Sequence, residues 1–290
     1  MPIFDRDFVS TLDRLSVNLQ MHLTEGMSGG RKSKAKGSSA EFSDYREYSI
    51  GDDFRRIDWN AYGRFERLFV KLFNEEREAL IHIFMDGSKS MDFGIPKKSL
   101  QAQKTAAALA FLAFNTLDRV RIVTLGGSAT PYLTGRSSFS RACDFLEQQR
   151  FEGMDGLLKG VRNSGLKSKG LSVVISDFLV REKLEDLLKY LLYQKQEVIL
   201  VQVLSREELW PTLEGQVRLV DSETKEVKDI ALSPSLLRAY ETHAKAYMDG
   251  LQESAKKFGA TFVQIFHDEP FEKVIFEDFL DAGIVRQVVR

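Results

Sequence analysis

The pattern of apolar and polar positions changes at Leu80, where short apolar runs begin to alternate with longer amphipathic segments. The apolar runs are typical of buried strands, and they cover 80–85, 118–126, 171–177, 197–204 and 260–266. Between the first four runs, apolar residues recur every three to four positions, which predicts helices over 97–117, 137–149, 155–165 and 182–194. This alternation predicts an α/β fold with a doubly wound, mainly parallel sheet and helices on both faces.

Two segments interrupt this rhythm later in the chain. Residues 216–231 predict an inserted β-hairpin, with its turn near 222–225. Ser233 followed by Pro234 predicts the start of a long helix, because a serine hydroxyl can cap the first turn and proline has no amide hydrogen to leave unpaired there. The main domain is therefore expected to cover 78–290, with the hairpin inside it.

The pattern of the first 77 residues indicates three different segments. Residues 26–40 are rich in glycine, serine and lysine, and predict a flexible linker. Residues 41–77 combine many charges with aromatic rings such as Trp59, and these rings carry too much apolar area to leave in water. We therefore expect this segment to pack on the main domain. Residues 1–25 predict an amphipathic helix, whose apolar face consists of Phe4, Phe8, Leu12, Leu15 and Leu19.

The segment 41–77 allows two interpretations. Arginines interleaved with aromatic rings can form a stacking surface for nucleic acid. The positive charge is cancelled, however, by Asp44, Asp52, Asp53 and Asp58, which favours an internal ion-pair network around buried rings. The net charge of −1 over 290 residues also gives no general attraction to nucleic acid. Nucleic-acid binding is therefore the less favoured alternative.

Composition also indicates a cellular setting. Cys143 is the one cysteine, which excludes a disulfide within the chain and favours a reducing compartment. No apolar run approaches the ~18–20 residues that span a bilayer, and the N-terminus lacks the features of a signal peptide. We therefore expect a cytoplasmic protein without a membrane span.

The candidate chemistry lies at the ends of two predicted strands. The run that begins at Leu80 ends in Asp86, and the following turn carries Ser88 and Ser90 in the pattern D-x-S-x-S. The run LSVVISD ends in Asp177 about ninety residues later. Oxygen ligands on such turns suit a hard divalent cation, and Mg²⁺ is favoured over a transition metal. Because ligands bind at the carboxyl edge of doubly wound sheets, these four residues are expected to converge on one Mg²⁺ site.

Other interpretations of the same residues stay open. Asp86 alone would suit an Asx-turn, and Ser90 a helix N-cap. A Mg²⁺-dependent phosphoester hydrolase that uses Asp86 and Asp177 is a further alternative, although the sequence contains neither a recognisable general base nor a phosphate-binding loop. The four histidines are scattered without the spacing of metal ligands. A non-enzymatic interaction module is therefore the favoured function.

Several motifs resemble one bacterial family. The stretch EFSDYREYSIGDDFRRIDWNAYGR, followed by LFVKLFNEERE and MDGSKSM, resembles the family catalogued as domain of unknown function fifty-eight. The most specific motif is G-D-D-x-R-x-I-D-W, which covers Gly51 to Trp59. The resemblance implies a von Willebrand factor A-like domain that is preceded by a family-specific N-terminal segment. It also implies a MoxR-type AAA+ ATPase, or a client of one, as the partner, with the chain acting as an adaptor or co-chaperone.

The D-x-S-x-S motif itself resembles the metal-ion-dependent adhesion site of von Willebrand factor A domains. Such sites usually take a third hydroxyl from a G-G-T-D-L-like turn, and Met154 stands at the matching position in FEGMDGLL. A thioether is a poor ligand for Mg²⁺, so the resemblance implies a weak or partial ion site. Asp155 and Thr134 are the alternative sources of an additional ligand.

Overall fold

A computed structural model describes residues 3–21, 41–74, 79–153, 156–166, 168–180, 182–212, 215–221 and 226–287. The chain divides into two compact units. The main unit consists of Met1–Leu23 and Glu78–Arg290, and the small unit consists of Thr24–Arg77. The linker predicted over 26–40 lies outside the described residues.

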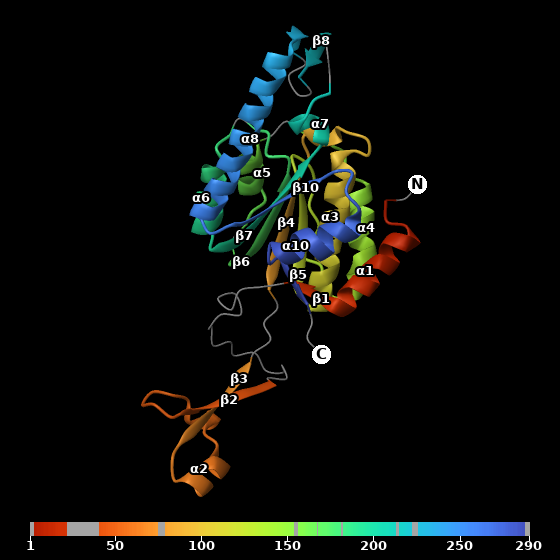
Figure 1. The fold of residues 1–290 in the computed structure, drawn as a ribbon. Helices are drawn as coiled ribbons and strands as arrows, with labels where there is room; N and C mark the ends of the chain where they lie inside the picture. The colour runs from red at the N-terminus through yellow and green to blue at the C-terminus, as the bar shows by residue number, and fades with distance from the viewer. Residues whose placement is uncertain are drawn as a thin grey trace. The chain divides into compact units, whose positions relative to one another are not determined.

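The main unit is built on a five-stranded parallel sheet (Figure 1). Its strands are β4 (Leu80–Asp86), β5 (Arg119–Leu125), β6 (Gly170–Ser176), β7 (Gln196–Leu204) and β10 (Thr261–Phe266). They lie in the order β10-β7-β6-β4-β5, and each neighbouring pair is parallel. Counted along the chain this is the order 2-1-3-4-5, one of the two common doubly wound arrangements. The predicted α/β fold class with a mainly parallel sheet is confirmed.

Helices cover both faces of this sheet (Figure 1). One face carries α3 (Lys98–Asn115), against which α1 (Arg6–Asn18) and α4 (Phe139–Glu147) pack. The other face carries α5 (Leu157–Asn163), α6 (Leu184–Tyr193) and α8 (Pro234–Lys257). Because both faces are covered, the central strands are buried along almost their whole length, as continuous apolar runs predict.

The core on the α5, α6 and α8 side shows how the strand pattern produces packing. Side chains alternate along a strand, so Phe84 of β4 and Val174 of β6 leave on the same face. They are fully buried against Leu188 of α6 and belong to the cluster that also contains Leu251 of α8. Burying an aliphatic or aromatic side chain of this size contributes roughly 1.5–3 kcal/mol. These contacts make the carboxyl ends of β4 and β6 a rigid base for the loops that follow.

The inserted hairpin follows α7 (Arg206–Leu209) and consists of β8 (Gly215–Val220) and β9 (Val227–Leu232). The two strands pair in antiparallel register, which confirms the predicted hairpin. The next helix is α8, where the Ser233 hydroxyl accepts a hydrogen bond from the Leu236 amide at 3.2 Å and Pro234 stands at the first position. The predicted helix start is confirmed in detail.

The two ends of the chain meet within the main unit. The amphipathic helix expected in 1–25 is α1, and its Phe8 and Leu12 are buried as predicted. The helix is shorter than predicted: Phe4 precedes it and Leu19 begins β1, so the expectation that these two residues belong to its apolar face was wrong. The Phe8 ring lies 4.9 Å from the ring of Phe271, in a C-terminal run of short helical turns. That run consists of α9 (Phe271–Lys273), η4 (Val274–Asp278) and α10 (Phe279–Asp281). Two short strands, β1 (Leu19–Met21) and β11 (Val285–Gln287), then pair in antiparallel register.

The small unit is a hairpin with helical turns in its connection. Strands β2 (Glu41–Glu47) and β3 (Phe69–Asn74) pair in antiparallel register, and η1 (Phe54–Arg56) and α2 (Trp59–Phe65) lie between them. The predicted ion pairs are present, with Arg46 at 2.7 Å from Asp52. Trp59 and Phe65 are 64% and 65% exposed, so the hairpin by itself does not bury these rings. Packing of the segment on the main domain stays a prediction.

Among the described residues, no helix is long and apolar enough to cross a membrane.

Candidate metal centre

The two predicted acids lie at the point where the strand order of the sheet reverses. Strand β4 has β5 on one side and β6 on the other, so the chain leaves β4 for one neighbour and returns later to form the other. Asp86 is the last residue of β4, and Asp177 directly follows β6. Met85 pairs with Ile175, which brings the two strand ends to the same level. Such a reversal leaves a crevice beyond the carboxyl ends of the strands, where doubly wound folds bind ligands.

Asp86 is held in place by neutral hydrogen-bond donors. It is 2% exposed. Its Oδ1 accepts a hydrogen bond from the Ser88 amide at 2.9 Å, and its Oδ2 accepts one from the Ser176 hydroxyl at 2.6 Å. The loop then enters the short helical turn η2 (Lys89–Asp92). In that turn the Ser88 and Ser90 hydroxyl oxygens lie 3.0 Å apart. Three of the four predicted ligands therefore share one tight loop.

The electrostatic environment of Asp86 opposes its charged form. Burial raises the pKa of this carboxyl, and the nearby negative charge of Asp177 raises it further. The hydrogen bonds from Ser176 and Ser88 act in the opposite direction. Among the described residues, no lysine, arginine or histidine forms an ion pair with Asp86. A buried carboxylate without a positive partner is costly, and a cation bound beside it would remove that cost.

Asp177 lies at the same edge but has a different partner. Ser176 and Asp177 are consecutive, so their side chains leave in opposite directions. Ser176 reaches Asp86, whereas Asp177 reaches the first residue of α3, where its Oδ2 lies 2.7 Å from the Lys98 ammonium. Its Oδ1 accepts the Leu179 amide at 3.0 Å. The second acid is therefore already neutralised by a lysine of the same chain.

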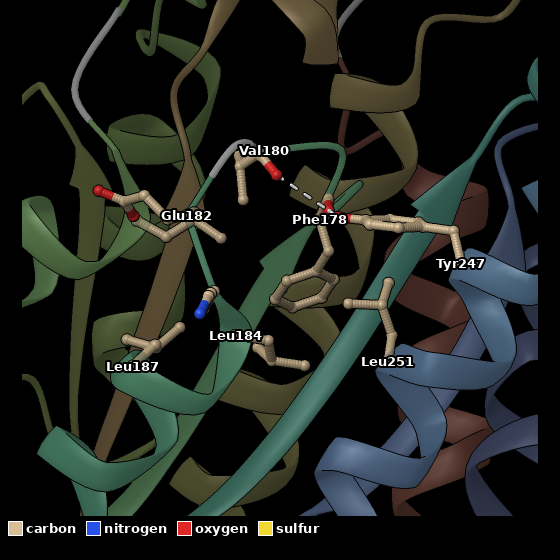
Figure 2. Close-up of a pocket in the computed structure, with 9 residues that line it drawn as sticks. Phe178, Val180, Glu182, Leu184, Leu187, Tyr247 and Leu251 are labelled. Atoms are coloured by element: carbon tan, nitrogen blue, oxygen red, sulfur yellow. Dashed lines mark hydrogen bonds between the residues drawn. The ribbon is translucent and has the colours of Figure 1, made fainter.

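The loop after Asp177 is fixed by α8 (Figure 2). Tyr247 extends from α8 to the backbone of this loop, and its hydroxyl donates to the Phe178 carbonyl at 2.7 Å and, more distantly, to the Val180 carbonyl at 3.5 Å. Phe178 is buried beneath it and lines a shallow apolar pocket with Leu184 and Leu251. The carboxyl edge is thus braced from both sides of the sheet.

The turn in which the third hydroxyl was expected lies beside the D-x-S-x-S loop. The Gly153 amide donates to the Gly87 carbonyl at 2.8 Å, and Ser88 and Gly153 form a parallel bridge. Met154 and Asp155 come directly after Gly153 but lie outside the described residues, so their predicted roles stay predictions.

The structure does not bring Thr134 to this site. Its hydroxyl donates to the Leu117 carbonyl at 3.1 Å, next to the amino end of β5. The preceding Leu133 pairs with Val120, whereas the residue of β5 that pairs with Asp86 is Leu125. Thr134 therefore lies toward the opposite edge of the sheet. The alternative in which it supplies a ligand is wrong, because sequence distance does not tell to which end of a strand a loop returns.

The residues of the loop fit a magnesium ion. An octahedral Mg²⁺ holds its ligands about 2.1 Å away, so neighbouring ligands lie about 3.0 Å apart. The Ser88 and Ser90 hydroxyl oxygens have this separation, and the Asp86 carboxylate supplies the negative charge beside them. Two hydroxyls and one carboxylate would leave positions for water or for an oxygen of a partner. Asp86, Ser88 and Ser90 are thus suited to hold the ion, while Asp177 is occupied by Lys98.

Two exposed lysines stand at the rim of this loop. Lys89 and Lys97 both pair with Asp92, at 2.6 and 2.5 Å. Their side chains are partly exposed, and the three residues together carry one positive charge. The local charge of these three residues attracts an acidic group, while the buried acids Asp86 and Asp177 repel it until a cation is bound.

Sequence reasoning missed two residues of this site. Ser176 carries a hydroxyl at the end of an apolar run, which is a weak signal that the alternation of strand side chains could have strengthened. Lys98 gave no local signal, since its two acidic partners stand 79 and 110 residues away in the sequence. Its place at a helix start even argues against a buried role, because the helix dipole disfavours positive charge there.

The comparison with known proteins gives a family. The family model described as protein of unknown function DUF58 matches residues 44–249, and the chain therefore belongs to this family. An uncharacterised protein of Mycobacterium tuberculosis strain H37Rv and one of Mycobacterium bovis are each 25% identical over 281 residues, which cover 92% of this chain and 87% of each relative.

Three solved structures are similar to this chain at lower sequence identity. An aerotolerance-related membrane protein from Bacteroides fragilis has a TM-score of 0.45 and 16% identity, and the match covers 71% of this chain and 98% of that one. The protein BatB from Bacteroides thetaiotaomicron has a TM-score of 0.42 and 16% identity over the same shares of the two chains. The von Willebrand factor A domain of SpRpn10 has a TM-score of 0.40 and 11% identity, over 69% of this chain and 94% of that one.

Proposed function

We propose that this chain is a non-enzymatic interaction module that works with a MoxR-type AAA+ ATPase, or with a client of one. The contact is made at the carboxyl edge of the sheet. Asp86, Ser88 and Ser90 hold a Mg²⁺ ion there, and an acidic side chain of the partner completes its coordination. The family resemblance supports the kind of partner, and the geometry of the loop supports the kind of contact.

The observation that carries the proposal is the state of Asp86. This carboxylate is buried, receives only neutral hydrogen bonds, and has no positive partner among the described residues. A purely structural aspartate would be expected to pair with a cationic side chain, to reach solvent or to take up a proton. A bound cation would do for Asp86 what a cationic side chain does elsewhere. The adjacent pair of hydroxyls then makes a hard cation the natural partner.

The rim supports an acidic partner. A carboxylate that approaches the open positions of the ion passes Lys89 and Lys97, which carry more positive charge than their shared Asp92 cancels. When an interface is centred on a desolvated charge pair, loss of one member typically costs ~2–5 kcal/mol of binding free energy. Removal of the ion should therefore lower the affinity for the partner by more than about tenfold.

The test is a calorimetric titration of the chain against a MoxR-type ATPase from the same genome. It compares excess Mg²⁺ with excess chelator, and wild type with Asp86→Asn. We expect the wild type to bind in Mg²⁺. In chelator, and for Asp86→Asn in Mg²⁺, the affinity should be at least about thirtyfold lower, which corresponds to ~2 kcal/mol of binding free energy. Asp92→Asn is the matched control, because this acid stands in the same loop but pairs with Lys89 and Lys97, so its loss should leave binding of an acidic partner undiminished or stronger. Undiminished binding in chelator and in Asp86→Asn would exclude the ion-bridged contact.

The remaining alternatives have their own assays. A Mg²⁺-dependent phosphoester hydrolase would release phosphate from a generic aryl phosphate, with a rate that depends on Asp86. Nucleic-acid binding through the small unit would give a mobility shift that weakens steeply with salt. No contact among the described residues favours either activity over the interaction module.

A further inference from the structure

Lys98 is a charged residue placed where charge is least expected. It is 0% exposed and stands at the first residue of α3. The helix dipole disfavours a cation at that position, and burial removes the water that would otherwise stabilise an ammonium group. A lysine is retained under these conditions only if its partners compensate for both effects.

Two acids provide that compensation from different elements. The Lys98 ammonium lies 2.7 Å from Asp177 Oδ2 and 2.6 Å from Glu208 Oε1. Glu208 belongs to α7, and its second oxygen accepts the Ser205 amide at 2.8 Å as part of a capping box. The loop after β6, the start of α3 and the turn after β7 are therefore joined by one ammonium group.

The charges at the carboxyl edge can be counted from these contacts. When Asp86 is ionised, as cation binding requires, Asp86, Asp177 and Glu208 carry three negative charges, and Lys98 supplies one positive charge against them. Asp177 is close enough to Asp86 for the two charges to interact. A divalent cation beside Asp86 would therefore respond to the state of the Lys98–Asp177 pair, because Coulomb interactions in a buried, low-dielectric setting are only weakly screened.

We propose that Lys98 is a built-in counter-cation that limits how tightly the Asp86 loop binds a divalent ion. The ammonium occupies Asp177 so that this acid neutralises Lys98 rather than the ion. The Asp86 loop then holds Mg²⁺ with one nearby carboxylate instead of two, which makes the ion exchangeable. This inference rests on the proposed function in that it takes the Asp86 loop to be the cation site.

Charge arithmetic makes the inference testable with four forms of the full chain. Lys98→Met removes one positive charge, and we expect Mg²⁺ to bind at least about tenfold more tightly. Asp177→Asn removes one negative charge and leaves Lys98 paired with Glu208 alone, and we expect binding about tenfold weaker. The double variant Lys98→Met/Asp177→Asn removes the pair as a whole, and its affinity should return to within about threefold of wild type. Calorimetry with MgCl₂, and the Mg²⁺-induced shift of the thermal unfolding midpoint, are the two readouts.

Lys97→Met is the matched control. Lys97 is the neighbouring residue, but its side chain is exposed and pairs with Asp92. Water and salt screen its charge, so its removal should change the Mg²⁺ affinity by less than about twofold. An equal effect of Lys97→Met and Lys98→Met would mean that general surface charge, not the buried pair, sets the affinity, and would overturn the inference.

The possible outcomes separate this inference from the proposed function. If wild type binds Mg²⁺ and Lys98→Met binds it no more tightly, the inference fails while the proposed function stands. If wild type shows no binding and Lys98→Met binds through Asp86, the inference holds while the Mg²⁺-dependent function fails. If the double variant stays as weak as Asp177→Asn, Asp177 serves the ion itself and the counter-cation role is overturned. If Lys98→Met does not fold, the comparison of the double variant with Asp177→Asn still tests the inference. If no folded form binds Mg²⁺, the inference is overturned.

Discussion

Asp58 in the small unit and Asp86 in the main unit are both shielded aspartates, yet they are satisfied in opposite ways. Asp58 accepts the Tyr45 hydroxyl at 2.8 Å, the Asn60 amide at 2.9 Å and the Lys71 ammonium at 3.1 Å. The hydrogen bond from Tyr45, together with that from Lys71, lowers the pKa of Asp58 to about 2. Asp86 has only the neutral donors Ser88 and Ser176, and burial raises its pKa.

Under the proposed function, this contrast separates a structural acid, Asp58, from an ion-binding acid, Asp86. Asp58 caps α2 and links it to both strands of the hairpin, and a cation is already part of its environment. Asp86 caps no helix and has no cation of its own among the described contacts. An acid whose charge is balanced within the chain has no need of a further cation, whereas a buried acid without a cationic partner must take up a proton or bind a cation. The G-D-D-x-R-x-I-D-W motif, which contains Asp58, is by this criterion a folding motif.

The largest expected effect concerns the main unit and follows from disrupting the loop that begins at Asp86. A Cβ added at Gly87 would lie 2.5 Å from the Leu125 carbonyl oxygen, which belongs to the backbone of β5. Gly87→Ala must therefore displace the loop or the strand. We expect the main unit to lose about 3 kcal/mol of unfolding free energy and the Mg²⁺ response to disappear. Chemical unfolding in urea, with and without Mg²⁺, measures both.

Gly127→Ala is the control for that change. It stands in the same region, but its added Cβ would meet nothing closer than 3.5 Å. We expect less than about 1 kcal/mol for it, with the Mg²⁺ response intact. Similar losses in the two variants would show that the close approach at Gly87 does not matter.

Acid titration should separate the two units. Burial, followed by the charge of Arg121, lowers the pKa of His82 in β4 to about 4. The unfolded chain then binds a proton more readily than the folded chain between pH 6.5 and about 4, so stability falls as the pH falls through this window. The loss in the main unit is at most about 3 kcal/mol. The contribution of Asp58 in the small unit persists to lower pH, and is lost only as the pH falls from about 4 toward 2.

The two tryptophans of the chain report on the two units separately, because Trp59 lies in the small unit and Trp210 in the main unit. Urea unfolding at pH 7 and pH 5 in a Trp59→Phe background follows the main unit alone. His82→Gln should flatten its pH dependence over this range. Asp86, whose pKa is raised by burial, contributes with the opposite sign, so the wild type is compared with His82→Gln. The same pH dependence in both forms would contradict the burial of a neutral His82.

Asp86→Asn should change stability with opposite signs in two conditions. In chelator, the variant removes a buried charge without a cation, and we expect it to be as stable as wild type or more stable by about 1 kcal/mol. In saturating Mg²⁺, wild type should gain roughly 1–3 kcal/mol that the variant does not. Thermal unfolding in the two buffers measures the difference. A variant that is strongly destabilised in chelator would make Asp86 a structural acid like Asp58.

The sequence predicts most of the fold because the fold depends on local patterns. Strands β4 and β6 follow from continuous apolar runs, and the start of α8 follows from Ser233 and Pro234. The D-x-S-x-S loop is local too, so Asp86, Ser88 and Ser90 could be expected together. Lys98 could not, since its role depends on partners that only the strand order brings near. The misplacement of Thr134 has the same cause, because a loop beside β5 can lie at either of its ends.

The smallest expected effect concerns Asp58 and tests whether it acts only within the small unit. Asp58→Ala removes the cap of α2 and the contacts with Tyr45 and Lys71, so the hairpin should open more often. We expect hydrogen exchange of the β2 and β3 amides to become about tenfold faster, and the same in Mg²⁺ and in chelator. Asp58→Asn keeps a good capping group but loses the charge, and should have a weaker effect. Asp53→Ala, which removes only the cap of η1, is the matched control. If Asp58→Ala left the hairpin unchanged but altered the Mg²⁺ response of the main unit, the division between a structural acid and an ion-binding acid would fail, since Asp58 would then act on the main unit.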